Sequence, residues 1–290
     1  MRADLAAAER PAKAPSIESS LRAWGLHRVP FSSDARTSGL FETAAHPQLL
    51  SLLNATASLR GLMLLTGNPG AGKSALVKAW MAGLEPKRFL PLLITQSSLS
   101  GTGVLEVVLA KLGERTRFRR SNNLLALEKH LAELEPVTLV LVLDDAQNYP
   151  GPALEEIRLL MGLGGGRCSA FGLVLLGDAY LLDSLRLSVQ RALFSRISAS
   201  ASLAPLSGGE IEGYLNWHVS QAGLEKDIFA PAAIDLLAGA SEGNPRILGL
   251  LAQAAWFAAA AQQVFTTIEA EHVHSALRQV PSASVKIYQG

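Results

Sequence analysis

Residues 67–74 combine side chains and spacing that could bind phosphate. They read GNPGAGKS and fit the pattern GxxxxGK[ST]. Glycines in such a loop let backbone N–H groups close around phosphate oxygens, and the helix that follows presents its positive end to them. Lys73 would reach the β- and γ-phosphates, and the Ser74 hydroxyl would coordinate Mg²⁺. The predicted nucleotide-binding residues of the loop are Asn68, Pro69, Gly70, Ala71, Gly72, Lys73 and Ser74.

A pair of carboxylates follows the most apolar run of the chain. Asp144 and Asp145 come directly after LVLVL at 139–143. Asp144 would hold the magnesium ion, directly or through water, and Asp145 would polarise the water that attacks the γ-phosphate. The alternative is a buried strand that ends in an acidic turn, but the phosphate loop elsewhere in the chain favours catalysis. Together the two segments predict hydrolysis of ATP to ADP and phosphate, with ATP and Mg²⁺ as ligands.

The elements that must position these residues alternate between strand and helix. Apolar runs at 61–66, 89–95, 137–143, 171–176 and 197–203 predict strands, and the segments between the first four of them have helical periodicity. This alternation predicts an α/β fold with a parallel sheet. Only helical patterns follow Pro205. We therefore predict a nucleotide-binding αβα domain at 21–204 and a helical lid domain at 205–280, with tails at 1–20 and 281–290.

Composition excludes several classes of protein. Hydrophobic residues make up 49% of the chain and charged residues 18%, which excludes disorder over most of its length. The formal charge of +1 provides no overall basic field, so contact with nucleic acid would need a local patch. The single cysteine, Cys168, permits no internal disulfide. Every apolar run is shorter than the roughly 20 residues that cross a bilayer, so we expect a cytoplasmic protein without a membrane partner.

Several segments resemble the AAA+ ATPases of the ExeA-like group, and most of all its transposon-encoded members, the MuB- and TnsC-like transposition regulators. The resemblance spans roughly residues 20–280 and rests on GLHRVPF, GLFETAAHPQL, LTGNPGAGKS, LVLDDAQN, LVLLGDAYLLDSL, ALFSRISAS, LAPLSGGEIEGYL and GNPRIL. It implies a P-loop AAA+ core with helices on both sides of a parallel sheet, followed by an all-helical lid.

The same resemblance implies roles for two arginines. Arg196 in FSRIS is similar to the arginine finger that reaches a neighbouring subunit's γ-phosphate, and Arg191 is a second candidate for that role. Arg246 in GNPR is similar to the lid arginine that contacts the nucleotide. The alternatives are a surface arginine at a helix-to-strand junction for Arg196 and an ordinary charge at the start of a helix for Arg246.

Two aspartates depart from the family pattern. Asp145 stands where a glutamate is usual, and Asp178 stands where the sensor strand usually ends in a neutral polar residue. Aspartate is one methylene shorter than glutamate, and positioning of the attacking water tolerates errors of little more than ~0.5 Å. We therefore predict slow hydrolysis.

One short stretch is densely basic and could contact DNA. It contains Phe118 among five cations: Lys111, Arg115, Arg117, Arg119 and Arg120. Such side chains neutralise backbone phosphates without reading sequence. The alternative is a solvated loop, which most charge runs are.

The leading functional prediction is a transposition regulator that assembles as a ring or filament on double-stranded target DNA when ATP is bound. It would recruit or activate a transposase and disassemble on hydrolysis. The alternative is an ExeA-like or pilus-biogenesis ATPase that assists secretion or assembly at the cell envelope.

Overall fold

The computed structural model describes residues 16–32, 39–96, 99–164, 169–187 and 190–281. Cys168 and most of the two predicted tails lie outside these ranges. The chain divides into two compact units, one formed by Gly39–Pro205 and the other by the described residues 16–32 and 206–281. Each unit has its own core and is described by itself.

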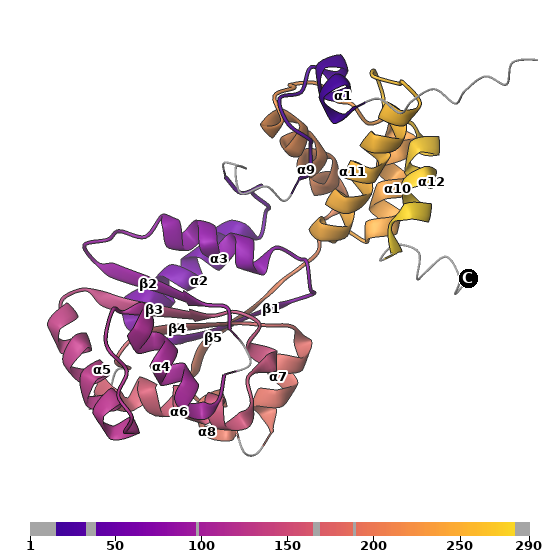
Figure 1. Cartoon of the computed structure of the whole chain (residues 1–290). Coiled ribbons are helices and arrows are strands. Elements are labelled where there is room, and N and C mark those ends of the chain that lie inside the picture. Colours follow the sequence, from indigo (N-terminus) through magenta and orange to yellow (C-terminus); the bar gives the residue numbers. More distant parts are fainter. Residues whose placement is uncertain (1–15, 33–38, 97–98, 165–168, 188–189, 282–290) are drawn as a thin grey trace, which may run out of the picture. The chain divides into compact units, whose positions relative to one another are not determined.

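A five-stranded sheet forms the centre of the first unit (Figure 1). The strand order is β2-β3-β4-β1-β5, and every neighbouring pair is parallel. This confirms the predicted α/β fold and its parallel sheet. The strands are β1 (Leu62–Gly67), β2 (Phe89–Ile94), β3 (Thr138–Leu143), β4 (Gly172–Leu176) and β5 (Ile197–Leu203).

Helices cover both faces of this sheet (Figure 1). Successive strand residues point to opposite faces, so apolar runs such as 139–143 supply two separate cores. One face packs against α2 (His46–Leu59) and α3 (Lys73–Ala82). The other face is covered by α4 (Gly101–Lys111), α5 (Arg120–Leu134), α6 (Gly151–Met161), α7 (Ala179–Arg186) and α8 (Arg191–Phe194), with short 3-10 turns η1 (Ala146–Asn148) and η2 (Gly162–Gly164) beside α6.

The strand register brings the carboxyl ends of the strands to one edge of the sheet. Leu65 on β1 pairs with Leu176 on β4, and Leu143 on β3 pairs with Leu175 on β4. The backbone N–H of Gly177 donates to the Leu65 carbonyl oxygen at 3.1 Å. The phosphate loop after β1 and the carboxylates after β3 therefore lie at the same edge, with the end of β4 between them.

Two helices add detail that the sequence prediction lacked. The helix α5 begins at Arg120, so Arg120 belongs to a helix and not to the loop before it. The short helix α8 (Arg191–Phe194) was not predicted, because four residues carry too little periodicity to distinguish a helix from a turn.

The second unit is helical. It contains α1 (Ile17–Trp24), α9 (Gly208–Gln221), α10 (Pro231–Ser241), α11 (Pro245–Ala261) and α12 (Ala270–Gln279). The central helix is α11, with nine buried residues that include the fully buried Trp256. No helix among the described residues is long and apolar enough to span a bilayer.

The second unit also contains an N-terminal segment that we expected in the nucleotide-binding domain. The Phe31 ring lies 5.0 Å from the His218 ring and 6.0 Å from the Phe229 ring, measured between centroids. Gln253 on α11 donates from its side-chain amide to the Pro30 carbonyl oxygen at 3.3 Å. We predicted that the nucleotide-binding domain starts at residue 21. The described residues 16–32 belong instead to the second unit, where their apolar side chains pack against the C-terminal helices.

Candidate nucleotide-binding site

The loop between β1 and α3 takes a backbone path that two of its glycines permit. Gly67 has φ 155°, and a Cβ atom there would lie 2.7 Å from the Leu203 carbonyl oxygen on β5. Gly72 has φ 100° and is the N-cap of α3. Side chains at these two positions would clash or strain the backbone, so the loop stays close to the sheet and places the start of α3 above its edge.

Lys73 is the first residue of α3, and its side chain folds back over the loop. Its Nζ atom donates to the carbonyl oxygens of Gly67 at 2.7 Å and Asn68 at 3.2 Å. The ammonium group is therefore held against the loop whose backbone N–H groups would surround phosphate. Ser74 is the next residue of the same helix, half-buried at its first turn.

Asp144 is held at the end of β3. The residue is only 9% exposed, and its backbone N–H donates to the Ile94 carbonyl oxygen at 2.9 Å. Burial, and secondly the negative charge of Asp144, raise the pKa of Tyr149 to about 12. The Tyr149 hydroxyl donates to the Gln96 carbonyl oxygen at 2.9 Å, which ties the segment after β3 to the end of β2.

Asp145 has an uncommon backbone conformation. It lies in the left-handed region, with φ 49° and ψ 44°, and its N–H donates to Asp144 Oδ1 at 3.0 Å. Aspartate tolerates this region better than most residues. The turn is what directs the Asp145 side chain away from the strand and makes it exposed, whereas Asp144 stays buried.

Gln147 is a site residue that we did not predict. Its Nε2 atom donates to Asp145 Oδ1 at 3.3 Å. Its Oε1 atom is buried and, among the described residues, has no hydrogen-bond partner. The same oxygen lies 3.0 Å from the position of a Cβ built on Gly177 at the end of β4. The Gln147 amide thus lies between the Asp145 carboxylate and the end of β4. The sequence pattern did not indicate this position, because it depends on the turn of the backbone after β3.

Asp178 has a structural explanation. It is the N-cap of α7, and its Oδ1 atom accepts a hydrogen bond from the Tyr180 backbone N–H at 3.0 Å. Aspartate is among the best N-cap residues, since its side chain satisfies a helix donor that would otherwise be unpaired. This role accounts for an acidic residue at a position where the resemblance implies a neutral one.

The donor chemistry of this edge fits a magnesium nucleotide. A hydroxyl group on Ser74 and a carboxylate on Asp144 are hard oxygen ligands of the kind that Mg²⁺ prefers. Ser74 lies in the first turn of α3, after the loop that follows β1, and Asp144 follows β3. Only β4 lies between these two strands in the sheet. The ammonium group of Lys73 and the start of α3 add the positive charge that a triphosphate requires.

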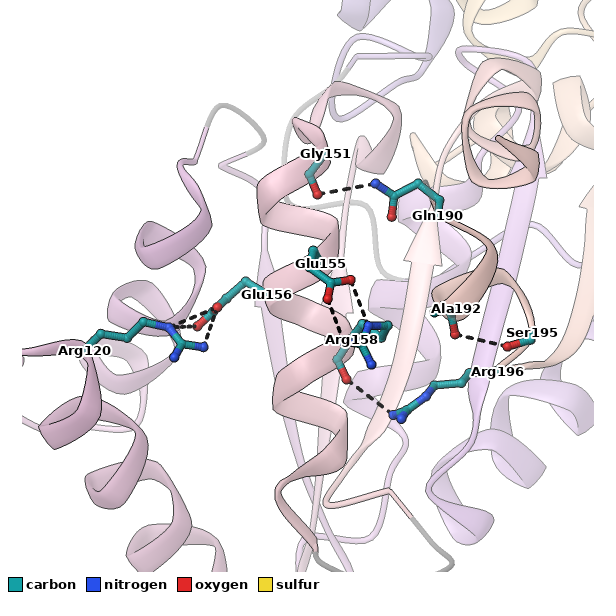
Figure 2. A network of polar contacts seen from close by, with 9 residues as sticks. All are labelled: Arg120, Gly151, Glu155, Glu156, Arg158, Gln190, Ala192, Ser195 and Arg196. Carbon is teal, nitrogen blue, oxygen red and sulfur yellow. Dashed lines mark hydrogen bonds and ion pairs between the residues drawn. The ribbon is translucent and has the colours of Figure 1, made fainter. Parts of the chain in front are cut away.

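Arg196 does not join these residues. It immediately precedes β5, whose first residue Ile197 pairs with Leu62, the first residue of β1. Arg196 is therefore at the amino edge of the sheet, and the phosphate loop is at the carboxyl edge. Its exposed side chain donates to the Arg158 carbonyl oxygen on α6 at 3.3 Å (Figure 2).

An ion pair on α6 lies next to this contact. Arg158 donates to the Glu155 carboxylate at 2.6 and 2.8 Å (Figure 2). The hydrogen bond from Arg158, and to a lesser degree the charge of Arg196, hold the pKa of Glu155 below its usual value. Two arginines and one carboxylate therefore interact at the surface. The hydrogen bond to Arg158 gives the Arg196 side chain a defined position.

Arg246 lies at the first turn of α11 in the second unit. Its backbone N–H donates to Asn244 Oδ1 at 3.0 Å, and its side chain is exposed. The structure thus gives it the start-of-helix position that both interpretations of the sequence require.

The predicted DNA-binding cations divide into two groups. Arg120 makes a two-point ion pair with Glu156 on α6, with its Nη2 atom 2.8 Å from Oε2 (Figure 2). Since the Glu156 side chain is only 7% exposed, Arg120 neutralises a buried charge, and contact of Arg120 with DNA would compete with this ion pair. The other four cations are exposed: Lys111, Arg115, Arg117 and Arg119.

Comparison with known proteins agrees with this architecture. Residues 56–185 match the family model described as "AAA domain". The chain is similar to Cdc6p from Pyrobaculum aerophilum, with a TM-score of 0.66 and 20% identity over 86% of this chain and 70% of that one. This is the AAA+ fold. The Aeropyrum pernix ORC1 protein, solved in complex with DNA, shares the AAA+ fold with a TM-score of 0.63 and 18% identity over 86% of this chain and 68% of that one.

A curated relative extends the similarity beyond the AAA domain. General secretion pathway protein A of Aeromonas hydrophila is 28% identical over 253 residues, which is 82% of this chain and 44% of the relative. The chain therefore spans less than half the length of that relative. The similarity supports the ExeA-like type that the sequence motifs indicate.

Proposed function

We propose that the protein is an ATPase that assembles on duplex DNA when ATP is bound and regulates a transposase. The observation that carries the ATPase assignment is the alignment of the phosphate loop after β1 and Asp144 after β3 at one edge of the sheet. The two segments, which are remote in sequence, flank the end of β4, and this supports their joint use in binding phosphate and metal.

Each residue of this edge has a defined task in the proposed reaction. Lys73 moves from the loop carbonyls to the phosphates and neutralises their charge. Ser74 and Asp144 would hold the metal ion, which would offset the negative charge of the phosphates. Asp145 orients water for in-line attack, and Gln147 fixes the carboxylate through its amide.

The position of Arg196 supports the proposed assembly. The residue stands at the opposite edge of the sheet from Lys73 in the same chain, so a contact with the γ-phosphate would require a second copy. An arginine supplied in this way speeds phosphoryl transfer by roughly 10³- to 10⁵-fold in other nucleotide hydrolases. Hydrolysis would then be timed by assembly. Arg246 would contact the nucleotide from the helical unit.

The DNA-binding part of the proposal rests on the exposed cations that precede α5. Lys111, Arg115, Arg117 and Arg119 would contact backbone phosphates. ORC1, which shares the fold, was solved in complex with DNA. The transposase partner is proposed from the sequence resemblance alone.

A second candidate is an ATPase that assists secretion. The observation that favours it is the 28% identity to General secretion pathway protein A over 82% of this chain. The same ATP-dependent assembly would then act at the cell envelope, and DNA would not be its template.

One experiment separates the two candidates. The purified protein is mixed with linear duplex DNA and ATP, ADP or a non-hydrolysable ATP analogue, and the products are imaged by electron microscopy and measured by sedimentation. We expect rings or filaments on DNA with ATP or the analogue, and none with ADP. The variant Lys73→Ala should form none in any nucleotide. Nucleotide-dependent assembly without DNA binding would favour the secretion candidate.

A further inference from the structure

We propose that Phe118 is an apolar wedge that inserts beside a base step of duplex DNA, while the arginines around it hold the phosphates. The proposal deepens the proposed function, on which it rests. It changes the expected mode of contact from backbone binding alone to backbone binding with local unstacking.

Phe118 is the most exposed large apolar side chain among the described residues. Its relative exposure is 104%, so no part of the ring is covered by the protein. The other highly exposed apolar side chains, Leu59 at 75% and Tyr180 at 77%, retain some cover. A ring left entirely in water forgoes the burial that would stabilise the fold by about 1.5–3 kcal/mol.

The backbone on both sides of Phe118 is fixed. The Arg117 N–H donates to Asn123 Oδ1 at 2.7 Å, and Asn123 Nδ2 donates to the Arg117 carbonyl oxygen at 3.0 Å. Asn123 is only 2% exposed, so this two-way clamp is anchored in the core. On the other side, Arg119 is the N-cap of α5, and its carbonyl oxygen accepts from Asn122 N–H at 3.0 Å.

The residue that follows is anchored as well. Arg120 is paired with the nearly buried Glu156 on α6. The exposed ring is thus held by a segment that has already lost most of its conformational entropy on folding. Binding a ligand therefore costs less entropy, because the segment is already ordered.

The charge around the ring identifies the class of ligand. Arg115, Arg117 and Arg119 are exposed and surround Phe118 in the sequence. Cations on both sides of an apolar wedge complement a polymer that alternates phosphates with flat apolar surfaces. Architectural DNA-binding proteins insert phenylalanine and other apolar side chains between base steps in this way. A solvated basic loop would need no aromatic residue and no clamp.

The test measures affinity for paired and for locally unpaired DNA. Fluorescein-labelled duplexes of about 30 base pairs, one fully paired and one with a central mismatch, are titrated with full-length protein and a non-hydrolysable ATP analogue. Unstacking costs less at a mismatch, so the wild-type protein should bind that duplex several-fold more tightly. Phe118→Ala should weaken binding roughly 10-fold and remove the preference. Phe118→Trp should keep it.

Two further variants separate the wedge from the charges. The double variant Arg117→Ala with Arg119→Ala should make the negative slope of log K against log salt concentration shallower by about 2, whereas Phe118→Ala should leave the slope unchanged. Leu125→Ala, which removes another exposed apolar side chain on α5, serves as the control and should behave like the wild type.

The outcomes distinguish this proposal from the proposed function. Equal binding of both duplexes by the wild type and by Phe118→Ala would overturn the wedge and leave ATP-dependent DNA assembly intact. Absence of DNA binding by the wild type in every nucleotide would overturn both. A preference for single strands over the mismatched duplex, lost in Phe118→Ala, would replace the wedge by base stacking on an open strand.

Discussion

The Arg196 guanidinium donates from Nη1 to the backbone carbonyl oxygen of Arg158 at 3.3 Å (Figure 2). This contact holds the side chain of the proposed arginine finger against α6, at the amino edge of the sheet. The same helix carries Glu156, the partner of Arg120 next to the basic loop. One helix therefore connects the surface proposed to contact DNA with the arginine proposed to contact a neighbouring nucleotide.

Arg196→Ala should abolish hydrolysis without abolishing nucleotide binding. ATP affinity should change by less than about 3-fold, while turnover in the assembled state should fall at least about 100-fold, because the charge is supplied only at the transition state. Arg191→Ala, which removes the second candidate on the adjacent helix α8, should leave turnover close to that of the wild type. A comparable loss in Arg191→Ala alone would assign the role to Arg191.

Mixing variants tests whether Arg196 acts on another copy. Asp145→Asn retains Arg196 and the phosphate loop but lacks the carboxylate that would orient water, and Arg196→Ala has the reverse defect. A mixture of the two should recover part of the lost activity. Failure to recover any activity, with both variants shown to co-assemble, would contradict action between copies.

Asp145→Glu should raise turnover. The wild-type carboxylate is one methylene shorter than that of glutamate, so we expect steady-state hydrolysis below about one per second. The longer side chain should bring the carboxylate to the water, whereas Asp145→Asn should reduce turnover further. Phosphate release is the measurement. Wild-type turnover well above one per second would contradict the idea that Asp145 limits the reaction.

Gln147→Ala should lower kcat roughly 10-fold and leave KM for ATP nearly unchanged. The amide touches the Asp145 carboxylate at 3.3 Å, so its loss should affect the positioning of the carboxylate and not the binding of substrate. Gln147→Glu, which keeps the shape but places an anion beside Asp145, should be at least as slow. A raised KM with unchanged kcat would assign Gln147 to nucleotide binding.

Arg120→Ala should destabilise the first unit more than it affects DNA binding. It leaves the buried Glu156 carboxylate without its partner, and we expect a loss of about 2 kcal/mol, reduced from the value for fully buried pairs because Arg120 is 39% exposed. The double variant with Glu156→Gln should recover part of that loss. Urea unfolding measures both. If Arg120→Ala left stability unchanged but greatly weakened DNA binding, the main role of Arg120 would be contact with DNA.

Folding of the second unit should depend on pH through His218. The ring centroid lies 4.5 Å from that of Tyr214 and 5.0 Å from that of Phe31, and burial, followed by the charge of Arg28, lowers the pKa of His218 to about 4. Between pH 6.5 and 4 the unfolded chain takes up a proton that the folded chain does not. The free energy of unfolding should therefore fall by about 2–3 kcal/mol as pH drops across this range.

His218→Phe should remove most of that pH dependence, since phenylalanine keeps the aromatic packing but has no titrating group. Urea unfolding followed by tryptophan fluorescence at pH 7 and pH 4.5 gives the comparison. An equal loss of stability in the variant and the wild type would assign the pH dependence to other groups.

The sequence by itself determined the phosphate loop, the acidic strand end and the α/β alternation. These features are encoded over a few contiguous residues: glycines at fixed spacing allow the loop conformation, and apolar runs between helical segments form parallel strands. The helical unit after Pro205 is likewise evident from local periodicity.

Only the tertiary structure decided how the remaining polar residues are used. Arg120 and Arg119 are adjacent and chemically identical, yet only Arg120 faces Glu156, 36 positions further along the chain. Gln147 reaches Asp145 because the backbone turns through a left-handed conformation. Arg196 stands opposite the phosphate loop because β5 runs parallel to β1. Such pairings depend on strand order and helix packing, which bring distant residues together, and a linear pattern does not record them.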